Sequence, residues 1–307
     1  MIHAVTVTNY RGEKIKIDLR EPTITGFLIK SITGLGPVKA TVNTTEIVTN
    51  DGSIFNSARL EQRNIVLELL FMNTVKGESI EDVRQKSYKY FPVKKSLTLV
   101  IETDNRCVET VGYVESNEPD IFSSQEGAQI SIICPDPYFY SSGAQGTNTT
   151  VLSGTEATFE FPFSNEAVSE PALIMGRTVI NTAGVVIYTG DSEVGLTIRI
   201  HAVGSVENVT IYNLETRENM KIDTTKLAKF TGNGIIAGDD IVITTTRGEK
   251  RITLTREGTV YNILNCLSKD TDWFTLVKGD NQFAYTADDG PTNLQFRIEN
   301  KVVYEGV

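Results

Sequence analysis

The sequence predicts a mainly β protein with two domains. Its 307 residues are enough for two domains of ordinary size, each with its own core. Thr, Val and Ile recur in short runs separated by turn residues, which favours strands. A small, polar, uncharged stretch at 141–154 (SSGAQGTNTTVLSG) indicates a connection between halves. We therefore expect an N-terminal domain over 1–140, a linker over 141–154 and a C-terminal domain over 155–307.

Composition argues against several classes of protein. The formal net charge is -10 and no basic run reaches five residues, so we expect no stable nucleic-acid binding. Cys107, Cys134 and Cys266 are far apart and form no CxxC pair, which indicates reduced thiols. The N-terminus has no signal-peptide pattern, and no apolar run has the length of a membrane helix, so no membrane association is expected.

The first elements are strands and hairpins. His3–Val7 and Ile15–Leu19 alternate on either side of a short turn, which predicts a hairpin. In 26–72 a strand runs into a Gly-Leu-Gly-Pro turn, and a polar connector with the turn signal Asn50-Asp51-Gly52 follows. The apolar run Asn64–Phe71 suits a buried strand or a short buried helix. We favour a strand, because the run is short and β-branched at its start.

One helix is predicted in the N-terminal half. Ser79 and Asp82 have the spacing of a capping box. Pro92 ends the helix. The apolar stripe of this helix consists of Ile80, Val83, Ser87, Tyr90 and Phe91. Such a stripe predicts a helix that lies across a sheet.

Three strands should follow the helix. Leu97–Glu102 and Val108–Glu115 alternate around a four-residue turn and predict a hairpin. Ala128–Ile133 reads as a further strand. The sheet should stop at Cys134-Pro135-Asp136-Pro137, because two prolines do not continue a central strand.

The second half reads as short strands and turns, with no helix longer than two turns. This pattern predicts a β-sandwich. The alternating runs are Ala157–Phe163, Val185–Tyr188, Leu196–His201, Val209–Tyr212, Met220–Ile222, Ile241–Thr244, Arg251–Leu254 and Leu294–Ile298.

No catalytic, metal-binding or cofactor-binding residues are predicted. His3 and His201 are the two histidines, and neither has a His or Cys partner at ligand spacing. Each is expected on a strand, His3 half covered and His201 on the polar face. Gly190-Asp191-Ser192 lacks the G-x-S-x-G pattern of a nucleophile elbow, so a simple turn is expected.

Two acidic pairs have alternative interpretations. Asp239-Asp240 and Asp288-Asp289 suit turn caps, with calcium in a loop as the alternative. Any two acids could also meet as glycosidase carboxylates, but the sequence singles out no pair. Gly232-Asn233-Gly234 precedes the strand at Ile241 and not a helix, so it predicts a turn and not a dinucleotide loop. Trp273 is expected in a core or interface, with stacking on a sugar as the alternative.

Several blocks in the order of the chain resemble the distal tail proteins of long-tailed bacteriophages, the siphophage tail-component family. In the first half these are GFLIKSITGLGPVKATVNTTEI, DGSIFNSARLEQRNIVLELLF, the single helix and CPDPYFY. In the second half, Asn213–Glu218 resembles the family's N-x-x-T-G-E, with Arg217 where Gly is usual. Ala237–Ile243 resembles P-G-D-x-I-x-I, Trp273–Asn281 resembles L-x-x-G-x-N, and Tyr304–Val307 also fits.

The resemblance implies a fold and a structural role. The N-terminal domain would be a tail-tube-like β-sandwich with one helix and a protruding hairpin, and the C-terminal domain a galectin-like β-sandwich. Six copies would form a ring at the virion tail tip, assembled in the host bacterial cytoplasm. The ring would join the tail tube protein to the tail-associated hub protein and carry receptor-binding proteins. No enzymatic activity and no cofactor are implied.

Two hypotheses and two alternatives accompany this interpretation. Leu97–Glu115 or Thr41–Asn64 would form an arm that grips the next subunit, since a closed ring needs two different patches per subunit. The acidic chain would keep DNA phosphates from adhering to the channel. The alternatives are a carbohydrate-binding adhesin that uses the C-terminal sandwich, and an esterase or glycosidase on the tail.

Overall fold

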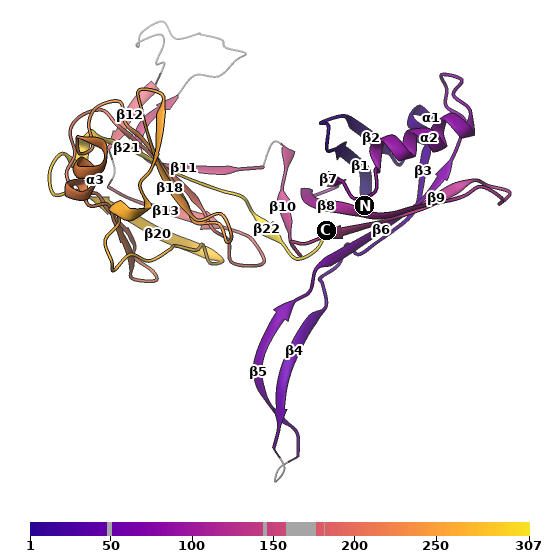
Figure 1. The fold of residues 1–307 in the computed structure, drawn as a ribbon, viewed down its shortest axis with the longest axis horizontal. Helices are drawn as coiled ribbons and strands as arrows, with labels where there is room; N and C mark the ends of the chain where they lie inside the picture. The colour runs from indigo at the N-terminus through magenta and orange to yellow at the C-terminus, as the bar shows by residue number, and fades with distance from the viewer. Residues whose placement is uncertain (48–50, 144–145, 158–175, 181) are drawn as a thin grey trace, which may run out of the picture. The chain divides into compact units, whose positions relative to one another are not determined.

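The mainly β character predicted from the sequence is confirmed, and the chain divides into two units. A computed structural model describes residues 1–47, 51–143, 146–157, 176–180 and 182–307 (Figure 1). The first unit consists of Met1–Gly146 together with Val303–Val307, and the second of Thr147–Val302. The last five residues, which the sequence analysis places in the C-terminal domain, therefore belong with the N-terminal unit.

The N-terminal unit is built on one antiparallel sheet. The strand order is β2-β1-β7-β8-β9-β6-β3, and β10 and β22 pair with each other next to β8. The sheet strands are β1 (Ile2–Asn9), β2 (Lys14–Asp18), β3 (Phe27–Thr33), β6 (Arg63–Phe71), β7 (Ser96–Thr103), β8 (Cys107–Asp120), β9 (Gly127–Cys134), β10 (Phe139–Ser141) and β22 (Val303–Tyr304). A separate two-stranded sheet contains β4 (Ala40–Glu46) and β5 (Ser53–Leu60), and the helices are α1 (Pro22–Thr25) and α2 (Ile80–Tyr90).

The predicted helix is confirmed as α2. The Ser79 hydroxyl accepts a hydrogen bond from the Asp82 amide, and the Asp82 carboxylate accepts one from the Ser79 amide. The carboxylate also accepts from the Ser79 hydroxyl, and these bonds lower the pKa of Asp82. Val83 and Ser87 are buried, as the predicted stripe requires, and the helix ends before Pro92.

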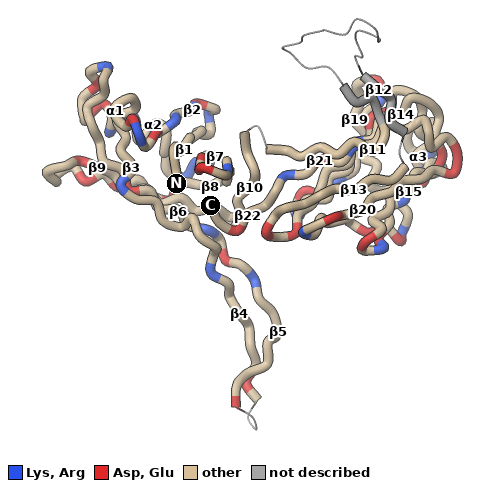
Figure 2. Tube along the Cα trace, turned by 180° about the vertical axis from the view of Figure 1, so that it is seen from behind, with Lys and Arg blue, Asp and Glu red and all other residues tan. Residues whose placement is uncertain are grey.

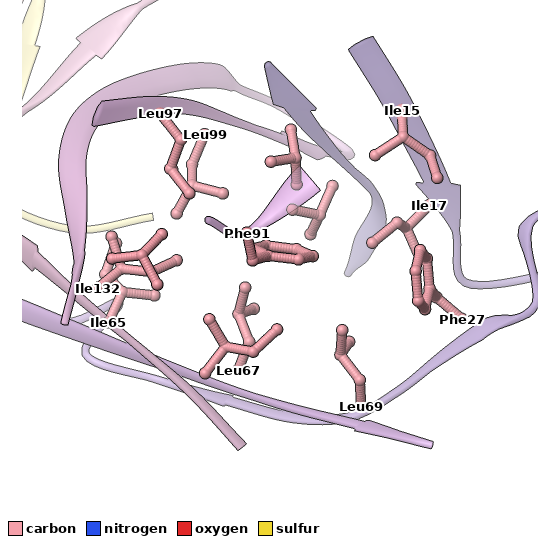
Figure 3. Packing of buried hydrophobic residues seen from close by; sticks show 14 of the residues in the cluster. Ile15, Ile17, Phe27, Ile65, Leu67, Leu69, Phe91, Leu97, Leu99 and Ile132 are labelled. Carbon is pink, nitrogen blue, oxygen red and sulfur yellow. The ribbon is translucent and has the colours of Figure 1, made fainter. Parts of the chain in front are cut away.

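The core of the N-terminal unit lies inside the curve of the sheet (Figure 3). Phe91 lies between Leu99 of β7 and Leu67 of β6 in this view, and all three side chains are buried. Ile17 of β2 and Phe27 of β3 close one end of the same cluster. Opposite parts of one curled sheet therefore face each other across a shared core.

The C-terminal unit has two sheets. One has the order β12-β11-β21-β14-β17-β18-β19 and the other β13-β20-β15-β16. The strands are β11 (Asn148–Ala157), β12 (Gly176–Ile180), β13 (Ala183–Tyr188), β14 (Thr197–Ala202), β15 (Thr210–Asn213), β16 (Glu218–Lys221), β17 (Asp240–Thr244), β18 (Arg251–Arg256), β19 (Thr259–Asn262), β20 (Gly279–Thr286) and β21 (Leu294–Asn300). The helices are α3 (Thr224–Thr231) and the 3-10 turns η2 (Leu264–Cys266) and η3 (Pro291–Asn293).

Aromatic contacts join the two sheets of this unit. The ring of Tyr285 on β20 stacks on that of Phe296 on β21, with centroids 4.8 Å apart. The Tyr285 hydroxyl donates a hydrogen bond of 2.8 Å to Ser153 Oγ on β11. Both sheets thus contribute to one interior, which is the arrangement expected of a sandwich.

Two sequence expectations need correction in this half. Residues 148–154, assigned to the linker, form most of β11, which pairs with β21. Helix α3 has eight residues, capped by Asp223 at its start and by left-handed Gly232 at its end, which slightly exceeds the two turns expected as the longest helix in this half. The part of the predicted run Ala157–Phe163 beyond Ala157 lies outside the described residues.

Candidate assembly site

The protruding hairpin of the N-terminal unit is formed by β4 and β5, and we call its described residues, 40–47 and 51–60, the arm (Figure 1). Every residue of β5 is exposed. The other segment considered for an arm, Leu97–Glu115, contains β7 and most of β8, which are central strands of the sheet. The arm therefore arises from the Thr41–Asn64 connector.

The two faces of the arm differ in polarity. Cross-strand partners alternate between faces along the hairpin. One face carries the pairs Ala40–Leu60, Val42–Ala58 and Thr44–Phe55, followed toward the end of the hairpin by the polar pair Glu46–Ser53. We call Ala40, Val42, Phe55, Ala58 and Leu60 the apolar face of the arm; Phe55 is 63% exposed and Val42 is 55% exposed.

The opposite face of the arm is mainly polar. It carries the pairs Thr41–Arg59 and Asn43–Ser57, with Thr45 opposite Ile54 beyond a register shift. The amide of Asn43 donates a 3.1 Å hydrogen bond to Ser57. Ile54 is the apolar exception on this face. The arm is therefore an amphipathic ribbon whose apolar face has no cover within the described part of its own unit.

Arg63 lies at the base of the arm and joins several backbone segments there by hydrogen bonds. Its side chain is buried, and it donates hydrogen bonds to the carbonyl oxygens of Gly34 (2.5 Å), Gly36 (2.7 Å), Pro137 (2.8 Å) and Glu305 (2.7 Å). Its guanidinium carbon also lies 4.2 Å from the centroid of the Phe139 ring. Burial lowers the pKa of Arg63. One cation thus joins the segment before β4, the proline-containing segment before β10 and the C-terminal residues.

Arg63 was not predicted as a site residue, although one local feature distinguishes it. It is a charged residue that opens an otherwise apolar strand, and its partners are backbone carbonyls distant in the chain. A composition or motif search does not detect such partners, because the backbone carbonyl that accepts the hydrogen bond is the same in every residue.

A small hollow adjoins Arg63 at the base of the arm. It measures about 30 Å³ and is lined by Pro37, Val38, Leu60, Arg63, Pro137, Tyr138 and Glu305. Such a volume holds about one water molecule, not a substrate. Since Leu60 belongs to both, the hollow continues the apolar face of the arm.

The two histidines lie in separate units and have separate partners. His3 Nε2 lies 2.5 Å from Asp104 Oδ1, and His201 Nδ1 lies 2.8 Å from Asp240 Oδ1. Within the described ranges, no three His, Cys, Asp or Glu side chains gather as metal ligands would. The cysteines are free thiols, and burial raises the pKa values of Cys134 and Cys266.

None of the described helices has the length and apolar character needed to span a membrane.

The acidic pairs have structural partners. Asp239 is fully buried, and its two carboxylate oxygens accept hydrogen bonds from Arg256 Nε (2.8 Å) and Nη2 (2.6 Å). The Ile236 amide donates a third bond of 2.9 Å, and the bonds to Asp239 raise the pKa of Arg256. Asp288 accepts from Asn208 at 2.8 Å. Asp239 therefore anchors a buried ion pair as well as capping a turn.

The remaining residues singled out in the sequence have ordinary surroundings. Trp273 is half-buried, and Lys250 Nζ lies 5.4 Å from its ring centroid. The Tyr188 hydroxyl donates to the Ser192 carbonyl at 2.7 Å in the turn that contains Asp191. Gly232 ends α3 in the left-handed conformation, which agrees with a turn rather than a phosphate loop.

Comparisons with known proteins connect this two-unit β fold with phage tails. Residues 189–299 match the family model described as siphovirus-type tail component, C-terminal domain. A comparison with curated proteins gave no match.

Two solved structures share the fold over the whole chain. The Dit protein (gp 19.1) of phage SPP1, a paradigm of hub adsorption apparatus in phages that infect Gram-positive bacteria, is 14% identical. The match covers 97% of this chain and 98% of that one, with a TM-score of 0.65. A chain of the phage P2 baseplate in its activated conformation with Ca is 12% identical, with complete coverage of both and a TM-score of 0.52.

The C-terminal unit thus matches a family of phage tail components over residues 189–299, and the whole chain shares its β-rich fold with SPP1 Dit. The predicted resemblance to siphophage distal tail proteins is confirmed by the family match in the C-terminal unit and by the fold shared with SPP1 Dit.

Proposed function

We propose that this protein is a structural hub component of a phage tail tip, with no enzymatic role. Six copies form a ring that joins the tail tube protein to the tail-associated hub protein and carries receptor-binding proteins. The family match over residues 189–299 and the fold shared with SPP1 Dit support a role in the tail or baseplate. The ring, its sixfold symmetry and these partners are our inference from that likeness.

The exposed arm is the structural feature that most supports the proposed ring. A two-stranded hairpin is only marginally stable by itself in water, yet β4 and β5 extend away from the sheet (Figure 1). Its apolar face is solvent-exposed. A surface of that kind indicates a protein partner. In a closed ring each copy offers two different patches, and the arm provides one of them.

An arm deletion tests the ring. Residues 40–60 are replaced by a short Gly-Ser linker, and the mass in solution is measured by light scattering. We expect the unaltered chain to form hexamers and the deletion to leave a folded monomer with the same strand content by circular dichroism. Hexamers that survive the deletion would contradict the role of the arm, and an unaltered chain that stays monomeric at every concentration would contradict the ring.

Substitutions on the two faces of the arm sharpen the test. Val42→Asp places a charge on the apolar face, and Ser57→Asp places the same charge on the polar face next to it. Both residues are exposed, so neither substitution should alter the fold. We expect Val42→Asp to weaken assembly at least tenfold and Ser57→Asp to change it less than threefold.

A further inference from the structure

The hairpin between β8 and β9 presents a second exposed apolar feature. We call residues 118–125 the tip. Phe122 is 100% exposed and Ile121 is 44% exposed. Connecting segments are normally polar, and a fully exposed Phe beside an exposed Ile is of the kind found at protein interfaces, where aromatic side chains act as anchors.

The residues that follow the tip are held firmly to the sheet. The Glu126 carbonyl accepts a 2.8 Å hydrogen bond from the Phe71 amide. The Glu126 carboxylate lies 2.8 Å from Arg84 of α2. At Gly127 any side chain would collide with the Leu69 carbonyl. Phe122 is therefore carried on a hairpin with a fixed base, which reduces the entropy lost on binding.

The tip and the arm complement each other in character. The apolar face of the arm continues into the hollow lined by Pro37 and Val38. The tip carries the exposed acids Glu118 and Asp120, and the base of the arm carries the exposed cations Lys39 and Arg59. Figure 2 shows the blue segments where the arm leaves the sheet and red segments on the β8–β9 hairpin.

The acids Glu118 and Asp120 of the tip and the cations Lys39 and Arg59 of the arm base form no ion pair among the described residues. The acids of the tip and the cations of the arm base are thus available to a partner. Arg59 lies on the polar face of the arm, so these charges would act by attracting the two surfaces during association rather than by pairing inside the apolar contact.

The tip cannot reach the arm of its own chain. The arm joins the sheet at Arg63, the first residue of β6. The tip joins it at Gly127, which pairs with Leu70 near the other end of β6. Seven residues of strand separate the two places, or roughly 23 Å at about 3.3 Å per residue, and both hairpins leave the sheet there (Figure 1). A contact between them must join two copies.

We propose that the tip of one copy binds the apolar face of the arm of the next, with Ile121 and Phe122 as the apolar anchors, and that the acids Glu118 and Asp120 are drawn toward the cations Lys39 and Arg59 at the base of that arm during association. Each copy uses its arm on one side and its tip on the other, which is the head-to-tail geometry that closes a ring. This inference rests on the proposed ring, and it identifies residues 118–125 as the segment of the neighbouring copy that the arm contacts.

Cysteine cross-linking between two variants tests this contact. In a Cys107→Ser background, which removes the half-exposed native thiol, Phe122→Cys is mixed with Ala58→Cys on the apolar face. The matched control mixes Phe122→Cys with Ser57→Cys on the opposite face. After mixing and ring assembly, a short bifunctional maleimide is added and dimers are quantified on a denaturing gel.

We expect the Ala58 pair to give at least ten times more cross-linked dimer than the Ser57 pair. Rings that form by light scattering but yield no cross-link, or equal cross-linking by both pairs, overturn the tip-to-arm contact and leave the proposed ring intact. A chain that forms no ring and no cross-link overturns both.

A charge on the anchor gives an independent measurement. Phe122→Asp should weaken ring assembly at least tenfold, the loss typical of an anchoring aromatic. Phe230→Asp, which alters a 60% exposed Phe of the C-terminal unit, is the matched control and should change assembly less than threefold. Equal assembly by the two variants would contradict the proposal.

Discussion

Replacing Arg63 with methionine tests how strongly the base of the arm is held. The substitution keeps an apolar stem of similar length but removes four hydrogen bonds to backbone carbonyls. Hydrogen bonds from a charged group contribute about 1.5–3 kcal/mol each, so the gross loss is roughly 6–12 kcal/mol. The variant no longer buries a cation, which returns several kcal/mol. We expect a net destabilisation of about 3–5 kcal/mol.

The loss should be confined to the N-terminal unit. Trp273, the single Trp, lies in the C-terminal unit, so its fluorescence reports unfolding there and serves as an internal reference. Hydrogen exchange followed by mass spectrometry on peptides from β3, β10 and the C-terminus reports on the base of the arm. We expect faster exchange in these peptides and an unchanged fluorescence transition.

A neighbouring arginine provides the control. Arg59 is exposed on the arm, so Arg59→Met should cost less than about 0.5 kcal/mol. If Arg63→Met exchanges no faster than Arg59→Met at these peptides, the four carbonyl bonds contribute little and the reasoning fails.

Two further substitutions test local features. Arg217 has φ 59°, a left-handed conformation that costs a non-Gly residue about 1–2 kcal/mol. Arg217→Gly removes this cost but gives the unfolded chain more conformational freedom, so we expect a net stabilisation of about 0.5 kcal/mol. A lower midpoint of denaturation by urea would contradict this. The pKa of Asp82 is lowered by its bonds to Ser79, so its stabilisation is complete above the unfolded-state pKa of about 3.9 and is lost as pH falls through the folded-state value. Asp82→Asn should therefore destabilise at pH 7, and the difference should begin to shrink below about pH 3.9 and disappear below the lowered folded-state pKa; a constant difference in thermal midpoint between pH 7 and pH 2.5 would count against the capping role.

Local features of the sequence were sufficient to predict most elements. The alternation in Leu97–Glu102 and Leu196–His201 is a property of consecutive residues, and both runs are strands. Ser79 and Asp82 are three residues apart, so the cap could be recognised without any tertiary contact. Helix α3 was not singled out in the sequence, because it is little longer than two turns and its threonines have low helical propensity.

The sequence by itself determined the mainly β character, the capped helix and the hairpins, since each depends on residues that are neighbours in the chain. Only the tertiary structure decided which hairpin is free of the sheet, which face of it is apolar, and where Arg63 and Asp239 find their partners. Arg63 bonds to Glu305, 242 positions away, and Asp239 pairs with Arg256, 17 positions away. Such contacts form when distant segments are packed together, and no local pattern records them.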